Sequence, residues 1–215
     1  MNILKLRVTE IFFSLQGETN TAGLPTVFIR LTGCPLRCQY CDTAYAFHGG
    51  KWYELDAIFA EIKQYRTRYI TVTGGEPLAQ QACVVLLKRL CDEGYTVSLE
   101  TSGAMDVSLV DSRVVKVIDI KTPGSGEVEK NDWDNIDQLL PHDQIKFVIC
   151  HREDYDWAKQ ILATYQLNLR SQVLFSPSYQ QISATELADW IVKDQLSVRL
   201  QIQLHKLLWG EVRGK

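Results

Sequence analysis

The stretch GCPLRCQYCDTAY, residues 33–45, places Cys34, Cys38 and Cys41 on one short segment at spacings of four and three. A structural zinc site normally takes four protein ligands, and a disulfide framework takes an even number of cysteines in a secreted chain. Three thiolates can instead hold a metal centre that keeps one coordination position open. The spacing alone is therefore compatible with two interpretations, an iron–sulfur cluster or a mononuclear zinc ion with His48 as its fourth ligand.

The composition is that of an ordinary globular chain. It has 215 residues, of which 46% are hydrophobic and 23% charged, with a formal net charge of −3. This length supports a single domain, residues 1–215, and the mild negative charge argues against a nucleic-acid-binding surface. The N-terminal segment lacks the apolar core of a signal peptide, and no apolar run approaches the roughly 18 residues that cross a bilayer. We therefore expect a cytoplasmic protein without a membrane segment, where clustered cysteines stay reduced.

On both sides of the cysteine segment, short β-branched runs alternate with segments of helical spacing. The predicted strands are 26–32, 69–73, 96–101, 114–120, 144–150, 172–176 and 197–204. The predicted helices are 54–66, 79–92, 153–166 and 183–195, with 124–142 left as loop or helix. This alternation predicts an α/β fold with right-handed crossovers and a parallel sheet. Because a complete eight-stranded barrel needs about 250 residues, we expect a small or incomplete (β/α) barrel of about six parallel strands.

Unusual loops follow four of these strands. GCPLRC follows the first strand, and TGGEP, ETSG and KTPGSG follow the next three. Because the carboxyl ends of parallel strands share one edge of the sheet, the four loops are predicted to meet at one mouth. Arg30 lies within the apolar run VFIRLTG, where a charge must be paired or lie close to that mouth. The pattern predicts an active site at this edge.

The motifs resemble those of a known enzyme family. The CxxxCxxC spacing and the GGEP segment at 74–77 resemble the radical S-adenosylmethionine (radical SAM) superfamily. The blocks FFSLQGE, FIRLTGC, CDT, TGGEP, ETSG, DIKTPGSG and QLHK, which span residues 12 to 206, are similar to the 7-carboxy-7-deazaguanine synthase family of queuosine precursor synthesis. The resemblance implies a radical SAM-type barrel. It also implies a lyase that converts 6-carboxy-5,6,7,8-tetrahydropterin to 7-carboxy-7-deazaguanine with loss of ammonia.

The resemblance implies three cofactors and assigns residues to each. A 4Fe–4S cluster would be held by Cys34, Cys38 and Cys41, with its open iron bound by S-adenosylmethionine, and Mg²⁺ would be held by Thr43. The residues implied to contact S-adenosylmethionine are Tyr40, Asp42, Gly74, Gly75, Glu76, Glu100, Ser102, Asp119 and Lys121. The residues implied to contact the substrate are Leu15, Gln16, Gly17, Glu18, Arg30, Thr73 and His205.

Taken one at a time, several of these residues have ordinary structural explanations. The GGEP segment fits a strand-to-helix turn with Pro77 at the first helical position. Asp42 and Thr43 fit a turn, and a lone histidine such as His205, expected near the end of the strand 197–204, is more often structural. The combination of motifs favours the functional interpretation, in which Glu76 fixes the ammonium group of S-adenosylmethionine.

Two segments depart from the family pattern. Relatives often continue with QGEG, whereas Glu18 is followed here by Thr19, a residue type that disfavours positive φ. The segment DIKTPGSG, residues 119–126, replaces a serine–proline–lysine pattern, so the nucleoside contacts predicted there could shift by one or two residues.

Two other functions fit part of the pattern. One is an activating enzyme that makes a glycyl radical on a partner protein, and the other is a non-catalytic zinc or redox module. Arg30, Thr43 and the segment 15–18 suit a small anionic substrate and favour the lyase. The resemblance further implies a pterin as the small-molecule substrate, a homodimer, and an electron donor such as a flavodoxin or ferredoxin.

Overall fold

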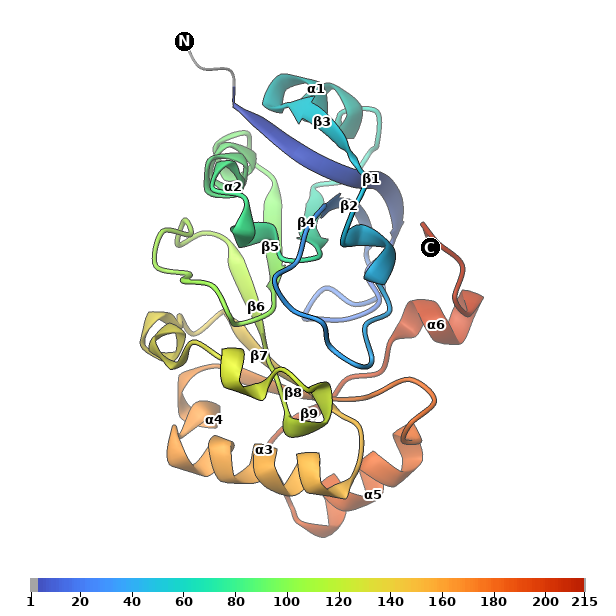
Figure 1. The fold of residues 1–215 in the computed structure, drawn as a ribbon, viewed down its shortest axis with the longest axis vertical. Helices are drawn as coiled ribbons and strands as arrows, with labels where there is room; N and C mark the ends of the chain where they lie inside the picture. The colour runs from blue at the N-terminus through green and yellow to red at the C-terminus, as the bar shows by residue number, and fades with distance from the viewer. Residues whose placement is uncertain (1–3, 215) are drawn as a thin grey trace.

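The computed structural model describes residues 4–214 and contains one mixed sheet (Figure 1). Its strands lie in the order β3-β1-β2-β4-β5-β6-β7-β8-β9. All neighbours from β2 to β9 are parallel, and β1 is antiparallel to both β2 and β3. The strand bounds are β1 Lys5–Leu15, β2 Pro25–Leu31, β3 Lys51–Glu54, β4 Tyr69–Gly74, β5 Thr96–Thr101, β6 Val115–Ile120, β7 Gln144–Ile149, β8 Gln172–Pro177 and β9 Arg199–Leu200.

The sheet is curved but open, because within residues 4–214 no strand pairing joins β9 back to β3. Six parallel strands, β2 and β4 to β8, have six or seven residues each, and β9 has two. The prediction of an incomplete (β/α) barrel of about six parallel strands is confirmed.

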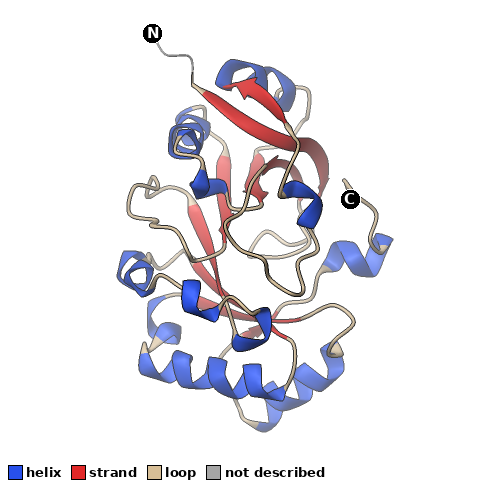
Figure 2. Ribbon diagram, in the orientation of Figure 1, coloured by secondary structure: helices blue, strands red, loops and turns tan. Residues whose placement is uncertain are grey.

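Helices surround the sheet, as Figure 2 shows in blue against the red strands. Their bounds are α1 Leu55–Ile62, α2 Ala82–Asp92, α3 Arg152–Thr164, α4 Leu167–Arg170, α5 Ala184–Lys193 and α6 Leu204–Trp209. Ser183 caps α5 by accepting a hydrogen bond from the Glu186 amide at 3.0 Å, as its position before the apolar stripe predicts. The stretch 124–142 contains short 3-10 turns and no α-helix. Within the described range, no helix is both long and apolar enough to cross a membrane.

Alternation along the strands gives the sheet one apolar face and one polar face. In β2, Val27, Ile29 and Leu31 are fully buried in the apolar core, whereas Arg30 points the other way. β4 repeats the pattern with Ile70 and Val72 in the core and Thr71 and Thr73 on the opposite face, because successive strand side chains point to opposite sides. Helices α1 to α5 pack on the apolar face, and the polar face carries the functional site.

Two parts of the fold differ from the sequence prediction. Strands β1 and β3, which extend the sheet beyond β2, were not predicted. The predicted strand 197–204 was wrong beyond Leu200, because the chain leaves the sheet there. The Gln201 side chain donates to the Ile202 carbonyl at 2.7 Å, and the Leu204 amide donates to the Gly17 carbonyl at 3.0 Å. These bonds turn the chain into α6 and attach that helix to the segment that follows β1.

Candidate active site

A cavity of about 290 Å³ opens on the polar face of the sheet, at the carboxyl ends of the parallel strands. Cys34, Cys38 and Cys41 all line it, and all three are free thiols. The Cys41 Sγ atom lies 3.8 Å from the Thr43 hydroxyl, which also lines the cavity. The structure therefore brings the three thiols and the predicted magnesium ligand to one space at the mouth of the barrel.

The thiols fit a site that is completed by iron. Burial raises the pKa of Cys38 to about 11 and raises that of Cys34 as well. The protein alone thus holds these groups as thiols, and metal binding would displace their protons. Within residues 4–214 no three His, Cys, Asp or Glu side chains are placed to hold a single metal ion, and His48 is exposed and does not line the cavity. This geometry gives no support to the mononuclear zinc alternative with His48.

The two glycines of the GGEP segment pack closely against the backbone at the end of β2 and the start of the cysteine segment. A Cβ atom on Gly75 would lie 2.2 Å from the Gly33 carbonyl oxygen, and one on Gly74 would lie 2.2 Å from the Leu31 carbonyl oxygen. The Glu76 amide donates to the Gly33 carbonyl at 2.8 Å. Gly74 has φ of +143°, a conformation that L side chains rarely adopt. These close backbone contacts therefore require glycine at both positions, whether or not a ligand approaches them.

Glu76 is fully buried and does not line the cavity. Its carboxylate accepts hydrogen bonds from the Ser102 amide at 2.7 Å and from the Thr101 hydroxyl at 2.9 Å. It also accepts one from the Leu78 amide at 2.9 Å. The predicted contact of Glu76 with S-adenosylmethionine stays a prediction. What the structure shows is that Glu76 fixes the end of β5, where Thr101 and Ser102 reach the cavity wall.

The cavity wall at the end of β6, beside Tyr40 of the cysteine segment, contains buried polar atoms that have no hydrogen-bond partner among the described residues. The Asp119 Oδ1 atom and the Tyr40 hydroxyl are buried and have no hydrogen-bond partner among the described residues. The other Asp119 oxygen lies 3.2 Å from the Lys121 ammonium, and all three side chains line the cavity. Unsatisfied buried polar atoms are costly, so this wall fits a ligand that carries hydroxyl and amine groups, such as a nucleoside.

A second group of polar side chains lies at the ends of β1, β4 and β5. The Thr73 hydroxyl donates to Glu100 Oε2 at 2.8 Å, and the Gln16 amide nitrogen lies 3.3 Å from Glu100 Oε1. Gln16 itself is 2% exposed and also donates to Thr71 at 2.9 Å. Glu100 is thus grouped with Thr73 and Gln16, which were predicted for the substrate, although the sequence had placed it with the S-adenosylmethionine contacts.

Replacing Glu100 with Gln should stabilise the protein above the pKa of the native carboxyl. Burial and the nearby charge of Glu18 raise the pKa of Glu100, so the folded state binds its proton more tightly than the unfolded chain does. Glu100→Gln should therefore unfold at a higher temperature than wild type at pH 8. The difference should shrink as the pH falls toward 4.5, the ordinary value for Glu, because the native carboxyl becomes protonated. Thermal unfolding at pH 5 and pH 8 measures this, and a difference that does not change with pH would contradict it.

Arg30 is both paired and at the cavity. Its Nε atom donates to Glu10 at 2.7 Å, and the Tyr45 hydroxyl donates to the same Glu10 oxygen at 2.8 Å. The guanidinium lies over the rings of Phe12 and Tyr45, with centroid distances of 5.6 and 5.9 Å. Of the five N–H groups of Arg30, the Nε–H donates to Glu10. The two terminal NH₂ groups can therefore form a bidentate pair with a second carboxylate.

Helix α6 covers the substrate end of the cavity. The prediction that His205 lies at the end of a strand was wrong, because the residue lies on this helix. His205 nevertheless lines the cavity. A Cβ atom on Gly17 would lie 2.1 Å from the His205 Nδ1 atom, so this contact requires glycine. Gln203 donates to Glu18 at 2.9 Å, and Lys206 pairs with Asp42 at 2.9 Å. The helix thereby connects the segment after β1 with the cysteine segment.

Replacing Thr19 with Gly should stabilise the fold. Thr19 has φ of +67° and is 1% exposed, so a β-branched residue is held in the left-handed region that the sequence had marked as unfavourable for it. Glycine adopts this conformation without strain, and the strain for other residues is of order 1–2 kcal/mol. The change also removes a buried methyl group and the contact of the Thr19 hydroxyl with Thr21 at 3.2 Å, so we expect Thr19→Gly to raise the free energy of unfolding by less than about 1 kcal/mol. Urea unfolding measures it; an equal or larger gain for Thr21→Gly would show that φ is not the cause.

The cavity or supporting residues that sequence reasoning missed include Lys146, Glu10, Tyr45 and Gln203. Lys146 carried a usable signal, because it is a charge inside the apolar run QIKFVIC, as Arg30 is inside VFIRLTG. Glu10 carried none, since its role appears only when β1 pairs with β2 and places it opposite Arg30.

Comparison with known proteins agrees with this geometry. The family model of the radical SAM superfamily matches residues 28–119. A 7-carboxy-7-deazaguanine synthase from Koribacter versatilis is 42% identical over 97% of this chain and 100% of the relative. One from Chlorobaculum tepidum is 40% identical over 97% of each chain. The crystal structure of QueE from Escherichia coli has the same fold, with a TM-score of 0.78 at 23% identity over 94% of this chain and 95% of that one.

An incomplete barrel whose mouth holds a CxxxCxxC segment supported by a GGEP turn defines a radical SAM enzyme. Such an enzyme uses a 4Fe–4S cluster and S-adenosylmethionine and acts here on a small molecule. With a relative 42% identical across almost the whole chain, the protein belongs to the 7-carboxy-7-deazaguanine synthase family.

Proposed function

We propose that this protein converts 6-carboxy-5,6,7,8-tetrahydropterin to 7-carboxy-7-deazaguanine and ammonia, as a step in queuosine precursor synthesis. The observation that carries the proposal is that one cavity holds the three thiols together with Arg30 and the Glu100 group. The relatives named above support it, because they carry the synthase name. Substrate and product differ by the elements of ammonia alone, so the reaction needs no net oxidant.

The two halves of the cavity have different tasks. Cys34, Cys38 and Cys41 hold the cluster, and the wall with Asp119 and Lys121 receives the nucleoside of S-adenosylmethionine. Bound together, cluster and S-adenosylmethionine supply a 5′-deoxyadenosyl radical when one electron is added. The chain orients the two reactants and excludes water between them.

The half of the cavity proposed for the substrate recognises the substrate carboxylate and the polar edge of the pterin ring. The free fork of Arg30 pairs with the substrate carboxylate, and Glu18 and Gln16 accept and donate along the polar edge of the pterin. Glu100 lies in the same half, and its raised pKa suits it to exchange a proton while nitrogen leaves. His205 contacts the substrate from α6. Thr43 would supply one oxygen ligand to Mg²⁺, a cation that typically needs few protein ligands and also binds substrate and water.

The proposal extends to the partners of the enzyme. A flavodoxin or ferredoxin would supply the electron, and the reduced thiols suit a cytoplasmic location. A homodimer is supported by α6, where Leu207 and Leu208 are 72% and 50% exposed and no residue of the helix is buried. The whole chain, residues 1–215, would act as a single domain.

The test is an anaerobic assay of the iron-reconstituted protein. With reductant, S-adenosylmethionine, Mg²⁺ and 6-carboxy-5,6,7,8-tetrahydropterin, we expect 7-carboxy-7-deazaguanine and one equivalent of ammonia, detected by mass spectrometry and a coupled ammonia assay. Omitting Mg²⁺ should lower the rate. If 5′-deoxyadenosine forms but no deazapurine appears from the pterin, the substrate assignment is wrong.

A further inference from the structure

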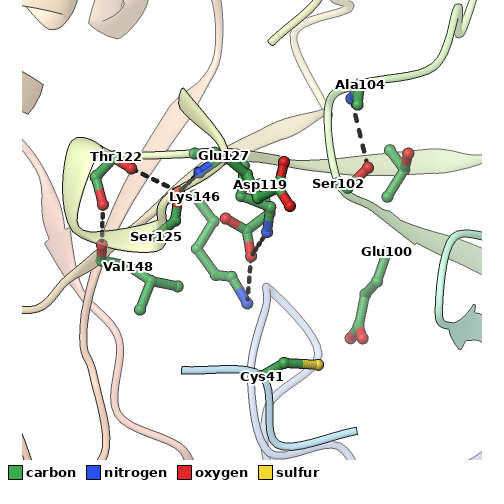
Figure 3. Close-up of polar contacts among 12 residues, drawn as sticks. Cys41, Glu100, Ser102, Ala104, Asp119, Thr122, Ser125, Glu127, Lys146 and Val148 are labelled. Carbon is green, nitrogen blue, oxygen red and sulfur yellow. Dashed lines mark hydrogen bonds and ion pairs between the residues drawn. The ribbon is translucent and has the colours of Figure 1, made fainter. Parts of the chain in front are cut away.

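Lys146 is a largely buried lysine on the cavity face of β7 that none of the assigned roles uses. Its ammonium lies 2.9 Å from Glu18 Oε2 and 3.5 Å from Asp119 Oδ2, and its side chain is 16% exposed. The register of the sheet fixes the second contact, because Asp119 on β6 is the Cα partner of Lys146 on β7. Figure 3 shows Lys146 reaching to Asp119, with Glu100 and Cys41 facing the same space.

The two carboxylates that Lys146 contacts belong to different halves of the cavity. Glu18 follows β1 and is held on its other oxygen by Gln203, in the half proposed for the pterin. Asp119 lies on the wall proposed for the nucleoside, where one oxygen lacks a partner among the described residues. The Lys146 ammonium therefore contacts one carboxylate in each of the two proposed halves of the cavity.

We propose that Lys146 is a positioning residue that fixes Glu18 and Asp119 from one point and so couples the binding of the pterin to the binding of S-adenosylmethionine. The proposal rests on the proposed function. When the nucleoside donates hydrogen bonds to Asp119, the ion pair between Asp119 and Lys146 weakens. The Lys146 ammonium then interacts mainly with Glu18. Glu18 is then held more firmly in the orientation that receives the pterin, so the second ligand loses less freedom on binding.

The charges around Lys146 agree with this role. Burial alone would raise the pKa of Glu18, but the charge and hydrogen bond of Lys146, together with Gln203 and His205, lower it. Burial would likewise lower the pKa of Lys146, and the charges of Glu18 and Asp119 raise it instead. The other charged groups that act on this cluster are Glu100, Lys121 and His205. Without Lys146, Glu18 and Glu100 would lose the positive charge that acts on both of them, which would leave Arg30 acting on Glu100 and His205 acting on Glu18.

The experiment measures binding without turnover. The reconstituted enzyme, with an oxidised cluster and no reductant, is titrated with 6-carboxy-5,6,7,8-tetrahydropterin in the presence and absence of S-adenosylmethionine. For wild type we expect the pterin Kd to be about 10-fold lower when S-adenosylmethionine is bound, within the usual range for coupled sites. For Lys146→Met we expect the pterin Kd to be raised roughly 10-fold or more. The ratio of the pterin Kd without S-adenosylmethionine to that with it should be close to one. Lys146→Arg, which keeps the charge, should restore part of the ratio.

Lys116→Met is the matched control. Lys116 is another buried lysine in an ion pair, with Asp143 at 2.7 Å, but it lies at the opposite end of β6 and does not line the cavity. Its removal should lower stability and leave the pterin Kd and its ratio unchanged. Lys159→Met, at a partly exposed pair with Asp194, is a milder control. A Lys146→Met enzyme with the wild-type ratio would overturn the proposal.

A double variant keeps the proposal testable if Lys146→Met folds poorly. Glu18→Gln with Lys146→Met removes the charge together with its partner, which relieves the unpaired acid. If Lys146 acts through Glu18, the double variant should bind the pterin no more weakly than Glu18→Gln alone. If the fold-losses in pterin affinity of the two single variants multiplied in the double variant, the proposal would be contradicted. A wild type that does not bind the pterin at all would instead refute the proposed function, before any variant is made.

Discussion

Cys38→Ala protein, reconstituted with iron and sulfide and supplied with reductant and S-adenosylmethionine, is expected to form no detectable 5′-deoxyadenosine. Cys38 lines the cavity between two other free thiols, and burial raises its pKa to about 11. A cluster with one open iron needs all three thiolates, since alanine offers no ligand and, among residues 4–214, no fourth cysteine lines the cavity. Product formation and iron content, measured on the same sample, check this expectation.

Cys91→Ala is the matched control for this loss. Cys91 is also a partly exposed free thiol, but it lies on α2 and does not line the cavity. This variant should keep full iron content and full formation of 5′-deoxyadenosine. If Cys38→Ala retained both as well, Cys38 would not be a cluster ligand, and the radical mechanism would lose its basis in this chain.

The parts of the site that sequence predicts are those whose chemistry is local. The cysteine segment and the GGEP segment can each be recognised from a few consecutive residues, and both lie where the strand-end argument puts them. Arg30 was predicted as well, because a guanidinium in an apolar strand needs a partner or an opening, and the structure provides Glu10 and the cavity.

What sequence could not give are contacts between residues far apart in the chain. Glu18 and Lys146 are separated by 128 positions and meet only because β1 and β7 border the same cavity. The grouping of Glu100 with Thr73 depends likewise on two neighbouring strands. The end of the strand 197–204 was misjudged for the same reason, since the Leu204 amide is drawn away by the Gly17 carbonyl.

A buried ion pair outside the cavity is a further feature that the sequence conceals. Asp143 is fully buried and accepts hydrogen bonds from the Lys116 amide at 2.8 Å and from the Leu140 amide at 2.8 Å. Its second oxygen also lies 2.7 Å from the Lys116 ammonium, which is 3% exposed. The pair joins the start of β6 to the turn before β7, where the apolar face of the sheet would otherwise bury an unpaired charge.

Asp143→Ala is therefore expected to be the most destabilising substitution away from the site. Removing one partner of a buried ion pair leaves the other charged in the core, at a cost of about 3–5 kcal/mol. For a domain of this size that corresponds to a fall in Tm of roughly 6–20 °C. Glu54→Ala, which removes a half-exposed pair with Lys5 at 3.5 Å, should cost less than about 1 kcal/mol. Calorimetry of both variants makes the comparison.

The same argument predicts a rescue. Replacing both partners, as Lys116→Met with Asp143→Leu, removes the unpaired charge and should recover much of the Tm lost in Asp143→Ala. The recovery should be partial, because the amides of Lys116 and Leu140 still lose their acceptor when the carboxylate is gone. If the double variant were no more stable than Asp143→Ala, the loss would come from those two amide hydrogen bonds and not from the buried charge.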